Sequence, residues 1–177
     1  MSSWGPICCS SKCFRVFVLL TSIAHSNMLS SCHRLFELEP RTKKVFHFEL
    51  DYNPTPQALK ESGNLKFAIR MLESFDACIS MLGPETEILY ELLADIGRRH
   101  VSYGVSPHFF PFFGQAMVYA LGNLLGDKWT PDLEEVWLDL YDSFSGIMMK
   151  AILDVHLERL MPDFFNKSSS KKSLKDI

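Results

Sequence analysis

The chain has 177 residues, of which 47% are hydrophobic, and its formal net charge is −3. This length suits one domain with a single core, and the hydrophobic fraction excludes a chain that is disordered throughout. The small net charge argues against nucleic acid as the main partner, because such a partner requires a strong positive field.

The N-terminal segment allows two interpretations. Lys12 and Arg15 flank the start of an apolar run over 16–24, which resembles a short signal peptide and is too short to span a bilayer as a helix. The interpretation we favour is a buried first helix in a cytoplasmic protein, with secretion as the alternative. We expect a flexible leader over 1–12, one domain over 13–165 and a disordered Ser/Lys-rich tail over 166–177.

The cysteines indicate a reducing compartment. Their number is odd, and no pair repeats a zinc-type spacing. A disulfide scaffold is therefore not expected. The N-terminal group could be lipidated or bind metal loosely, although reduced thiols in a flexible arm are the more ordinary case. The five cysteines are Cys8, Cys9, Cys13, Cys32 and Cys78.

The hydrophobic periodicity predicts helices and no strand. No segment alternates with period two over a useful length. Pro40, Gly83-Pro84 and Gly126-Asp127 end helices, while Ser106-Pro107 and Thr130-Pro131 supply a capping hydroxyl followed by a first-turn proline. A loop is expected over 53–56. The sequence predicts helices over about 13–24, 28–38, 64–82, 84–100, 107–125 and from 131 into the 150s.

Two adjacent apolar stripes run along the helix predicted over 64–82. Leu72, Phe75 and Ile79 belong to one stripe, and Phe67 and Met71 belong to the other. The first stripe should pack on protein. The second would face either a cofactor or a further layer of helices.

His100 closes a helix whose apolar residues, Leu89, Leu93 and Ile96 among them, recur at helical spacing. The imidazole lies one turn beyond Ile96 and on the same side. Two interpretations follow: a core histidine satisfied by a backbone carbonyl, or the neutral imidazole ligand of a haem iron.

The order of several signals resembles the globin family, within it the neuroglobin-like and invertebrate nerve-globin branch. The resemblance covers about 35–152, and it rests on the motifs together because none is decisive alone. They are Arg34-Leu35-Phe36-Glu37-Leu38-Glu39-Pro40, Phe46, Phe67-Ala68-Ile69-Arg70-Met71 ahead of Phe75-Asp76-Ala77-Cys78, Leu93-Ala94-Asp95-Ile96-Gly97-Arg98-Arg99-His100, Tyr103-Gly104-Val105, and Glu135-Val136-Trp137 with Leu140-Tyr141.

The resemblance implies an all-α globin fold of about seven to eight helices around a haem pocket, with haem b (iron protoporphyrin IX) as the cofactor. His100 matches the histidine that binds the iron, and Phe46 matches the phenylalanine packed flat on the haem. Val105 and Phe110 match haem contacts that follow the proximal helix. Arg70 matches a position that commonly reaches a haem propionate, although an ordinary solvated arginine is an equal alternative.

On the distal side the sequence departs from the family pattern. Met71 matches the small aliphatic position over the iron, and Phe67 stands where histidine or glutamine is usual. Because Phe67 cannot donate a hydrogen bond, we expect weak oxygen binding relative to carbon monoxide. We also expect five-coordinate ferrous haem, with Met71 or His47 as alternative sixth ligands. Cys32 replaces a large aromatic residue or leucine, and the match upstream of Leu35 is poor.

Three functions are compatible with this resemblance. The first is reversible binding of a diatomic gas (O2, CO or NO) for transport, storage or sensing. The second is a haem redox role, such as nitric-oxide dioxygenase or nitrite reductase activity. The third is a haemless globin-fold interaction module, which applies if Phe67 and Met71 fill the pocket. We expect a monomer or dimer that is not an enzyme and does not contact membranes.

Overall fold

The computed structural model of the chain describes residues 30–62, 64–82 and 86–162, and within these ranges it contains helices and no strand. The predicted all-α class is confirmed. The expectations for the leader over 1–12, the helix over 13–24 and the tail over 166–177 lie outside the described residues.

The first described helix covers 30–38 and ends just ahead of Pro40, as predicted. The chain then continues into η2, a 3-10 helix over Pro40–Phe46. Proline is tolerated at the first position of this helix because the amide N–H that it lacks would have no partner there. The Glu39 side chain caps η2 by accepting a hydrogen bond from the Arg41 amide. His47 follows in the left-handed conformation, with φ of 62°, and turns the chain away.

The helix α2 (Pro56–Glu61) was not predicted, because the sequence analysis treated Asn53 to Pro56 as a loop. Thr55 caps it by accepting from the Ala58 amide at 3.2 Å, and Pro56 occupies the first turn. The start signal is therefore the same hydroxyl–proline pair that was recognised at Thr130. The helix is six residues long, too short for hydrophobic periodicity to reveal.

The remaining helices match the predictions to within a few residues at each end. Ser106 and Thr130 act as the expected caps, accepting from the amides of His108 and Leu133. The predicted helix over 107–125 begins as the 3-10 segment η3. The elements are α3 (Asn64–Ser80), α4 (Thr86–Ser102), η3 (Pro107–Phe109), α5 (Phe110–Leu125), η4 (Gly126–Lys128) and α6 (Pro131–Leu160).

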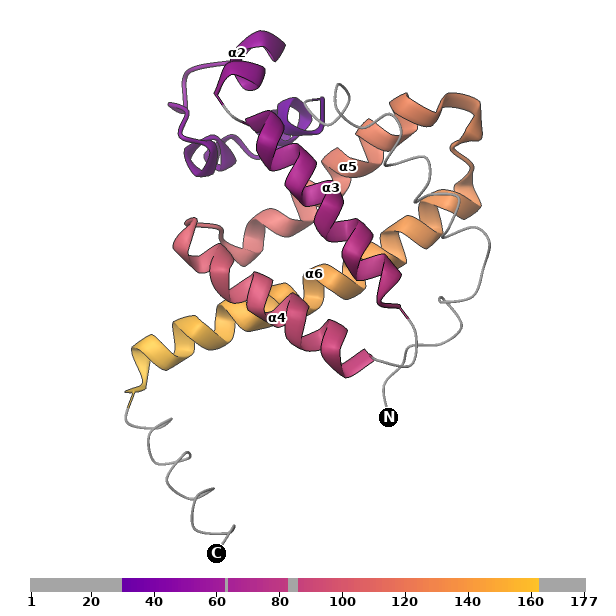
Figure 1. The fold of residues 1–177 in the computed structure, drawn as a ribbon. Helices are drawn as coiled ribbons and strands as arrows, with labels where there is room; N and C mark the ends of the chain where they lie inside the picture. The colour runs from indigo at the N-terminus through magenta and orange to yellow at the C-terminus, as the bar shows by residue number, and fades with distance from the viewer. Residues whose placement is uncertain (1–29, 63, 83–85, 163–177) are drawn as a thin grey trace, which may run out of the picture.

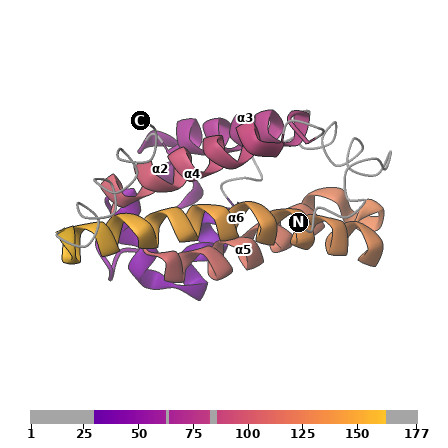
Figure 2. The same cartoon turned by 90° about the horizontal axis from the view of Figure 1, so that it is seen from below.

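The helices form two layers, with α3 and α4 on one side and α5 and α6 on the other (Figures 1 and 2). The long helix α6 supplies the centre of the core through Trp137 and Phe144. Phe75 of α3 lies tilted against Trp137 at 5.3 Å between centroids and stacks on Phe144 at 6.2 Å. Among the described helices, none is long and apolar enough to cross a membrane.

Candidate functional site

The imidazole of His100 lies in the last turn of α4 and is half-buried. Its Nδ1 lies 2.7 Å from the carbonyl oxygen of Ile96. A carbonyl can only accept, so Nδ1 carries the proton and Nε2 keeps a lone pair. Burial lowers the pKa of His100 from 6.5, against the opposing effect of the hydrogen bond to Ile96. The ring is therefore neutral at physiological pH, which is the form that binds metals.

Two aromatic rings fix the orientation of this imidazole. Tyr103 meets it edge-on at 5.8 Å between centroids, and Phe110 lies tilted at 6.0 Å. Between them the chain reverses at Gly104, whose φ of 72° suits glycine. The turn is closed by the Val105 amide, which donates to the His100 carbonyl at 3.1 Å. Val105 is half-buried and Phe110 is buried, so two predicted contact residues follow His100 closely.

Gly97 brings the backbone of α4 against α6 one turn before His100. A Cβ at this position would lie 2.6 Å from the Met148 carbonyl oxygen and 2.8 Å from the Met148 Cα. Side chains do not tolerate such distances, so the two helices can approach this closely only at glycine. This role was not predicted, although a glycine three residues before a helical histidine is a usable signal for a close crossing.

The predicted distal residues lie on η2 and on the first turns of α3. Phe46 ends η2 and meets Phe67 edge-on, with centroids 5.1 Å apart and planes at 86°. Phe46 also contacts Phe36 at 5.3 Å and packs on the buried cluster of Cys32, Phe36 and Leu59. The Phe67 side chain is nevertheless 38% exposed. The structure therefore has a row of edge-on ring contacts from Phe36 through Phe46 to Phe67. This row ends at the protein surface.

Met71 and Arg70 lie one turn further along α3 and point to different environments. Met71 is half-buried and packs on the core cluster of Met117, Leu121 and Trp137. Arg70 is exposed, and its guanidinium has no ion pair among the described residues. The place of Met71 over the iron and the contact of Arg70 with a propionate stay predictions.

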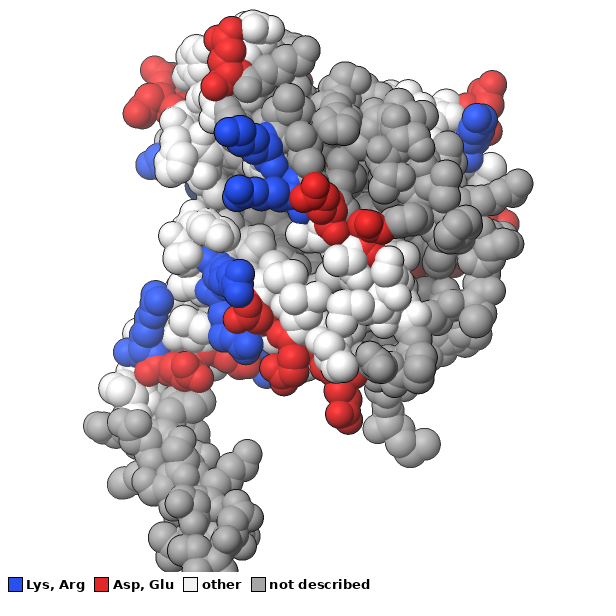
Figure 3. Space-filling view, in the orientation of Figure 1, with Lys and Arg blue, Asp and Glu red and all other residues white. Residues whose placement is uncertain are grey.

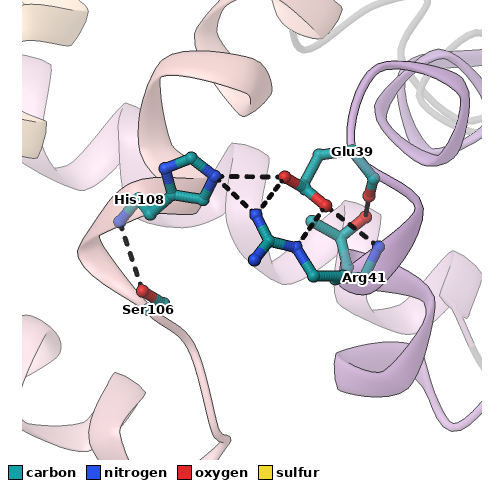
Figure 4. A network of polar contacts seen from close by, with 5 residues as sticks. Glu39, Arg41, Ser106 and His108 are labelled. Atoms are coloured by element: carbon teal, nitrogen blue, oxygen red, sulfur yellow. Dashed lines mark hydrogen bonds and ion pairs between the residues drawn. The ribbon is translucent and has the colours of Figure 1, made fainter.

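A polar network that the sequence analysis missed joins η2 to η3 (Figure 4). The Glu39 carboxylate accepts from Arg41 Nε at 2.8 Å and from Arg41 Nη2 at 2.7 Å. His108 Nε2 lies 3.1 Å from Glu39 Oε2 and 2.8 Å from Arg41 Nη2. The His108 side chain is 52% exposed, yet it connects the two segments. The hydrogen bonds from Arg41 are the main reason that the pKa of Glu39 falls from 4.5 to about 2.

Two surface hollows are lined by residues other than Glu39, Arg41 and His108. One, of about 470 Å³, is lined by Trp129, Glu134 and Leu138 among others, and one of about 480 Å³ is lined by His47, Phe48 and Tyr52 among others. The second contains His47, the alternative sixth ligand, and neither is lined by His100.

Comparison with known proteins identifies the family. The family model described as Globin matches residues 30–148, about two thirds of the chain. The chain is 31% identical to neuroglobin of Tetraodon nigroviridis over 119 residues, which cover 67% of this chain and 73% of that protein. It is 32% identical over 108 residues to neuroglobin-2 of Oncorhynchus mykiss, covering 61% of this chain and 67% of that protein.

More distant relatives agree with this result. Leghemoglobin-1 of Lupinus luteus is 26% identical over 137 residues, covering 73% of this chain and 86% of that protein. A solved structure described as a hexacoordinated heme protein from an anhydrobiotic tardigrade superposes with a TM-score of 0.68. It covers 81% of this chain and 94% of its own at 19% identity, which shows a common fold. The globin resemblance is confirmed: this chain belongs to the globin family.

Proposed function

We propose that the chain binds haem b with His100 as the iron ligand and reversibly binds a diatomic gas (O2, CO or NO) there. The observation that carries this proposal is the hydrogen bond from His100 Nδ1 to the Ile96 carbonyl oxygen. It fixes the tautomer, and Nε2 has no hydrogen-bond partner within the described part of the chain. When bound, the haem supplies an iron whose remaining coordination position takes the gas.

The residues that follow His100 fit a porphyrin. A porphyrin face requires apolar neighbours, and Val105 and Phe110 are of this type. We assign the Phe46–Phe67 pair, whose rings meet edge-on, to the same haem site. Arg70 is an exposed cation on α3 without an ion pair in the described residues. We assign to it the role of binding a propionate, because an arginine fork suits a carboxylate.

The distal residues favour a gas that needs no hydrogen bond. Phe67 has no donor, and the Cys32 thiol lies in an apolar cluster where burial raises its pKa to about 12. A neutral thiol is a weak donor. We therefore propose low oxygen affinity relative to carbon monoxide and a five-coordinate ferrous state. A six-coordinate ferrous spectrum would contradict the five-coordinate state. Met71 and His47 are the two side chains that would then supply the sixth ligand.

The experiment is an absorption spectrum of the full chain, expressed with ample haem precursor, beside three variants. We expect an intense Soret band for the wild type and its loss in His100→Ala. Adding imidazole to His100→Gly should restore it, because free imidazole occupies the space of the missing ring. His156→Ala removes an exposed histidine from α6 and should change nothing. A colourless wild-type protein would exclude the proposal and favour the haemless interaction module.

We also place the protein in the cytoplasm. The support is the presence of two buried free thiols, Cys32 and Cys78, in the described residues. Free thiols persist in reducing compartments. Fractionation of cells that express the full-length chain would test this, and recovery from the medium would contradict it.

A further inference from the structure

Glu39 anchors a set of contacts that we call the Glu39 clamp, consisting of Glu39, Arg41 and His108 (Figure 4). The Glu39 side chain is 9% exposed, whereas those of Arg41 and His108 are 63% and 52% exposed. A carboxylate withdrawn from water must be paired. Here three donors of Arg41, the amide, Nε and Nη2, satisfy it from within η2.

The contact with His108 differs from the Arg41 contacts because it connects distant parts of the chain. Residues 39 and 108 are 69 positions apart. A single ring nitrogen, Nε2, faces both an acceptor on Glu39 and a donor on Arg41. With a proton it donates to Glu39, and without one it accepts from Arg41. In either form, η3 is attached to η2 by one hydrogen bond.

The two attached segments carry different residues of the candidate site. Phe46 ends η2, and η3 follows the turn that begins at His100. At its far side this turn is held by Tyr141, whose hydroxyl donates to the Phe110 carbonyl at 2.7 Å. His108 itself packs edge-on against Phe112, at 5.2 Å. The turn over 101–109 is therefore fixed at α6 by Tyr141 and at η2 by Glu39.

We propose that the Glu39 clamp is a positioning element that holds the turn after His100 against the segment carrying Phe46 and thereby sets how long haem is retained. This inference rests on the proposed function. No hydrogen bond or ring contact of the described residues joins these three side chains to His100, so they act by fixing the two segments. Removal of the clamp lets the segments separate without removing any residue assigned to the haem itself.

The experiment compares His108→Ala with His108→Gln and Glu39→Gln in the full chain as purified. The first readout is hydrogen exchange in 40–48 and 101–109, which requires no haem. The second is the rate of haem transfer to a haem-free myoglobin acceptor. We expect His108→Ala and Glu39→Gln to raise exchange in both segments and to accelerate transfer roughly two- to fivefold, the range that a partly exposed ion pair supports.

Two controls separate positioning from a general loss of stability. His108→Gln keeps one group that can donate or accept, so it should restore both readouts toward the wild type. Ile152→Val truncates a fully buried side chain on α6, far along the chain from the clamp. It should lower overall stability without raising exchange selectively in 40–48 and 101–109. In a double-mutant cycle, the effects of Glu39→Gln and His108→Ala should not add.

The outcomes distinguish this inference from the proposed function. Unchanged exchange in His108→Ala would overturn the clamp, whatever the haem content. Raised exchange with an unchanged transfer rate would overturn the positioning role. A wild-type chain without haem would refute the proposed function and the retention claim together, while exchange would still decide whether the two segments are coupled.

Discussion

Gly97 touches the backbone of Met148, and this contact fixes where His100 lies. A Cβ on Gly97 would stand 2.6 Å from the Met148 carbonyl oxygen and 3.1 Å from the Ala151 Cβ. The first obstacle is backbone of another helix, which cannot rotate away as a side chain can. The crossing of α4 and α6 therefore requires a residue without a side chain, one turn before the proposed iron ligand.

Gly97→Ala should destabilise the fold and displace the end of α4. We expect a loss of about 1–3 kcal/mol in the free energy of unfolding, typical of overpacking a well-filled core. Urea denaturation followed by circular dichroism measures it. Gly146→Ala is the matched control, because nothing beyond the local helix backbone lies within 4 Å of a Cβ there. That variant should gain about 0.5–1 kcal/mol from helix propensity. Equal stability of the two variants would rule out the crossing argument.

Tyr141→Phe should remove the hydrogen bond that fixes the start of α5. The Tyr141 side chain is buried, and its hydroxyl donates to the Phe110 carbonyl. Without it a buried carbonyl loses its side-chain donor, at a cost of about 1–3 kcal/mol in unfolding free energy. Tyr119→Phe, at a ring that is 49% exposed, should stay within about 0.5 kcal/mol of the wild type. Thermal unfolding of both variants tests the difference, and a neutral Tyr141→Phe would contradict it.

Local patterns predicted the elements whose signals lie close together in the sequence. The Thr130-Pro131 start of α6 follows from capping chemistry, and the structure has it. The burial of Trp137 and Phe144 agrees with helical spacing along α6. Thr55-Pro56 carries the same start signal, yet α2 was missed because six residues show no periodicity. Short elements are fixed by packing, here by Leu59, which is fully buried among Cys32 and Phe36.

Contacts between distant residues were not predictable from the sequence alone. Glu39 and His108 bond across 69 positions, and nothing near either residue indicates the other. The exposure of Phe67 could not be predicted from the sequence either, because its apolar stripe suggested burial. Its edge-on contact with Phe46 depends on how η2 ends. By contrast, His100 was identified because its helix, its neighbours and its order in the chain all belong to one family pattern.

Phe67→His should raise oxygen affinity if the proposed function is correct. The introduced imidazole can donate a hydrogen bond to a partly charged ligand, which is worth about 1.5–3 kcal/mol, or roughly 10–100-fold in affinity. Flash photolysis measures oxygen and carbon monoxide binding in parallel, and the ratio of carbon monoxide to oxygen affinity should fall. Phe67→Leu keeps an apolar side chain without a donor and should leave that ratio near the wild-type value. If Leu and His changed the ratio alike, hydrogen bonding would not be the cause.

Acid should weaken the fold partly through Glu39. Hydrogen bonds from Arg41 lower the pKa of this carboxyl from 4.5 to about 2. A group whose pKa is lower in the folded state stabilises the fold at all pH values above its unfolded pKa, and that contribution disappears as the pH falls from 4.5 toward 2. Glu39→Gln cannot take up this proton, so its melting temperature should fall less steeply across that interval. At neutral pH the same variant should melt below the wild type, because a neutral amide accepts more weakly from Arg41.

Asp154→Asn is the control for this pH dependence. Asp154 pairs with Lys150 at 2.6 Å, but both side chains are about half exposed or more. Exposed pairs on one helix contribute little to stability. The difference in melting temperature between wild type and Asp154→Asn should therefore stay small at every pH, whereas the difference between wild type and Glu39→Gln should shrink on acidification. Parallel curves for Glu39→Gln and the wild type between pH 4.5 and 2 would mean that the Glu39 carboxyl titrates alike in the folded and unfolded chain.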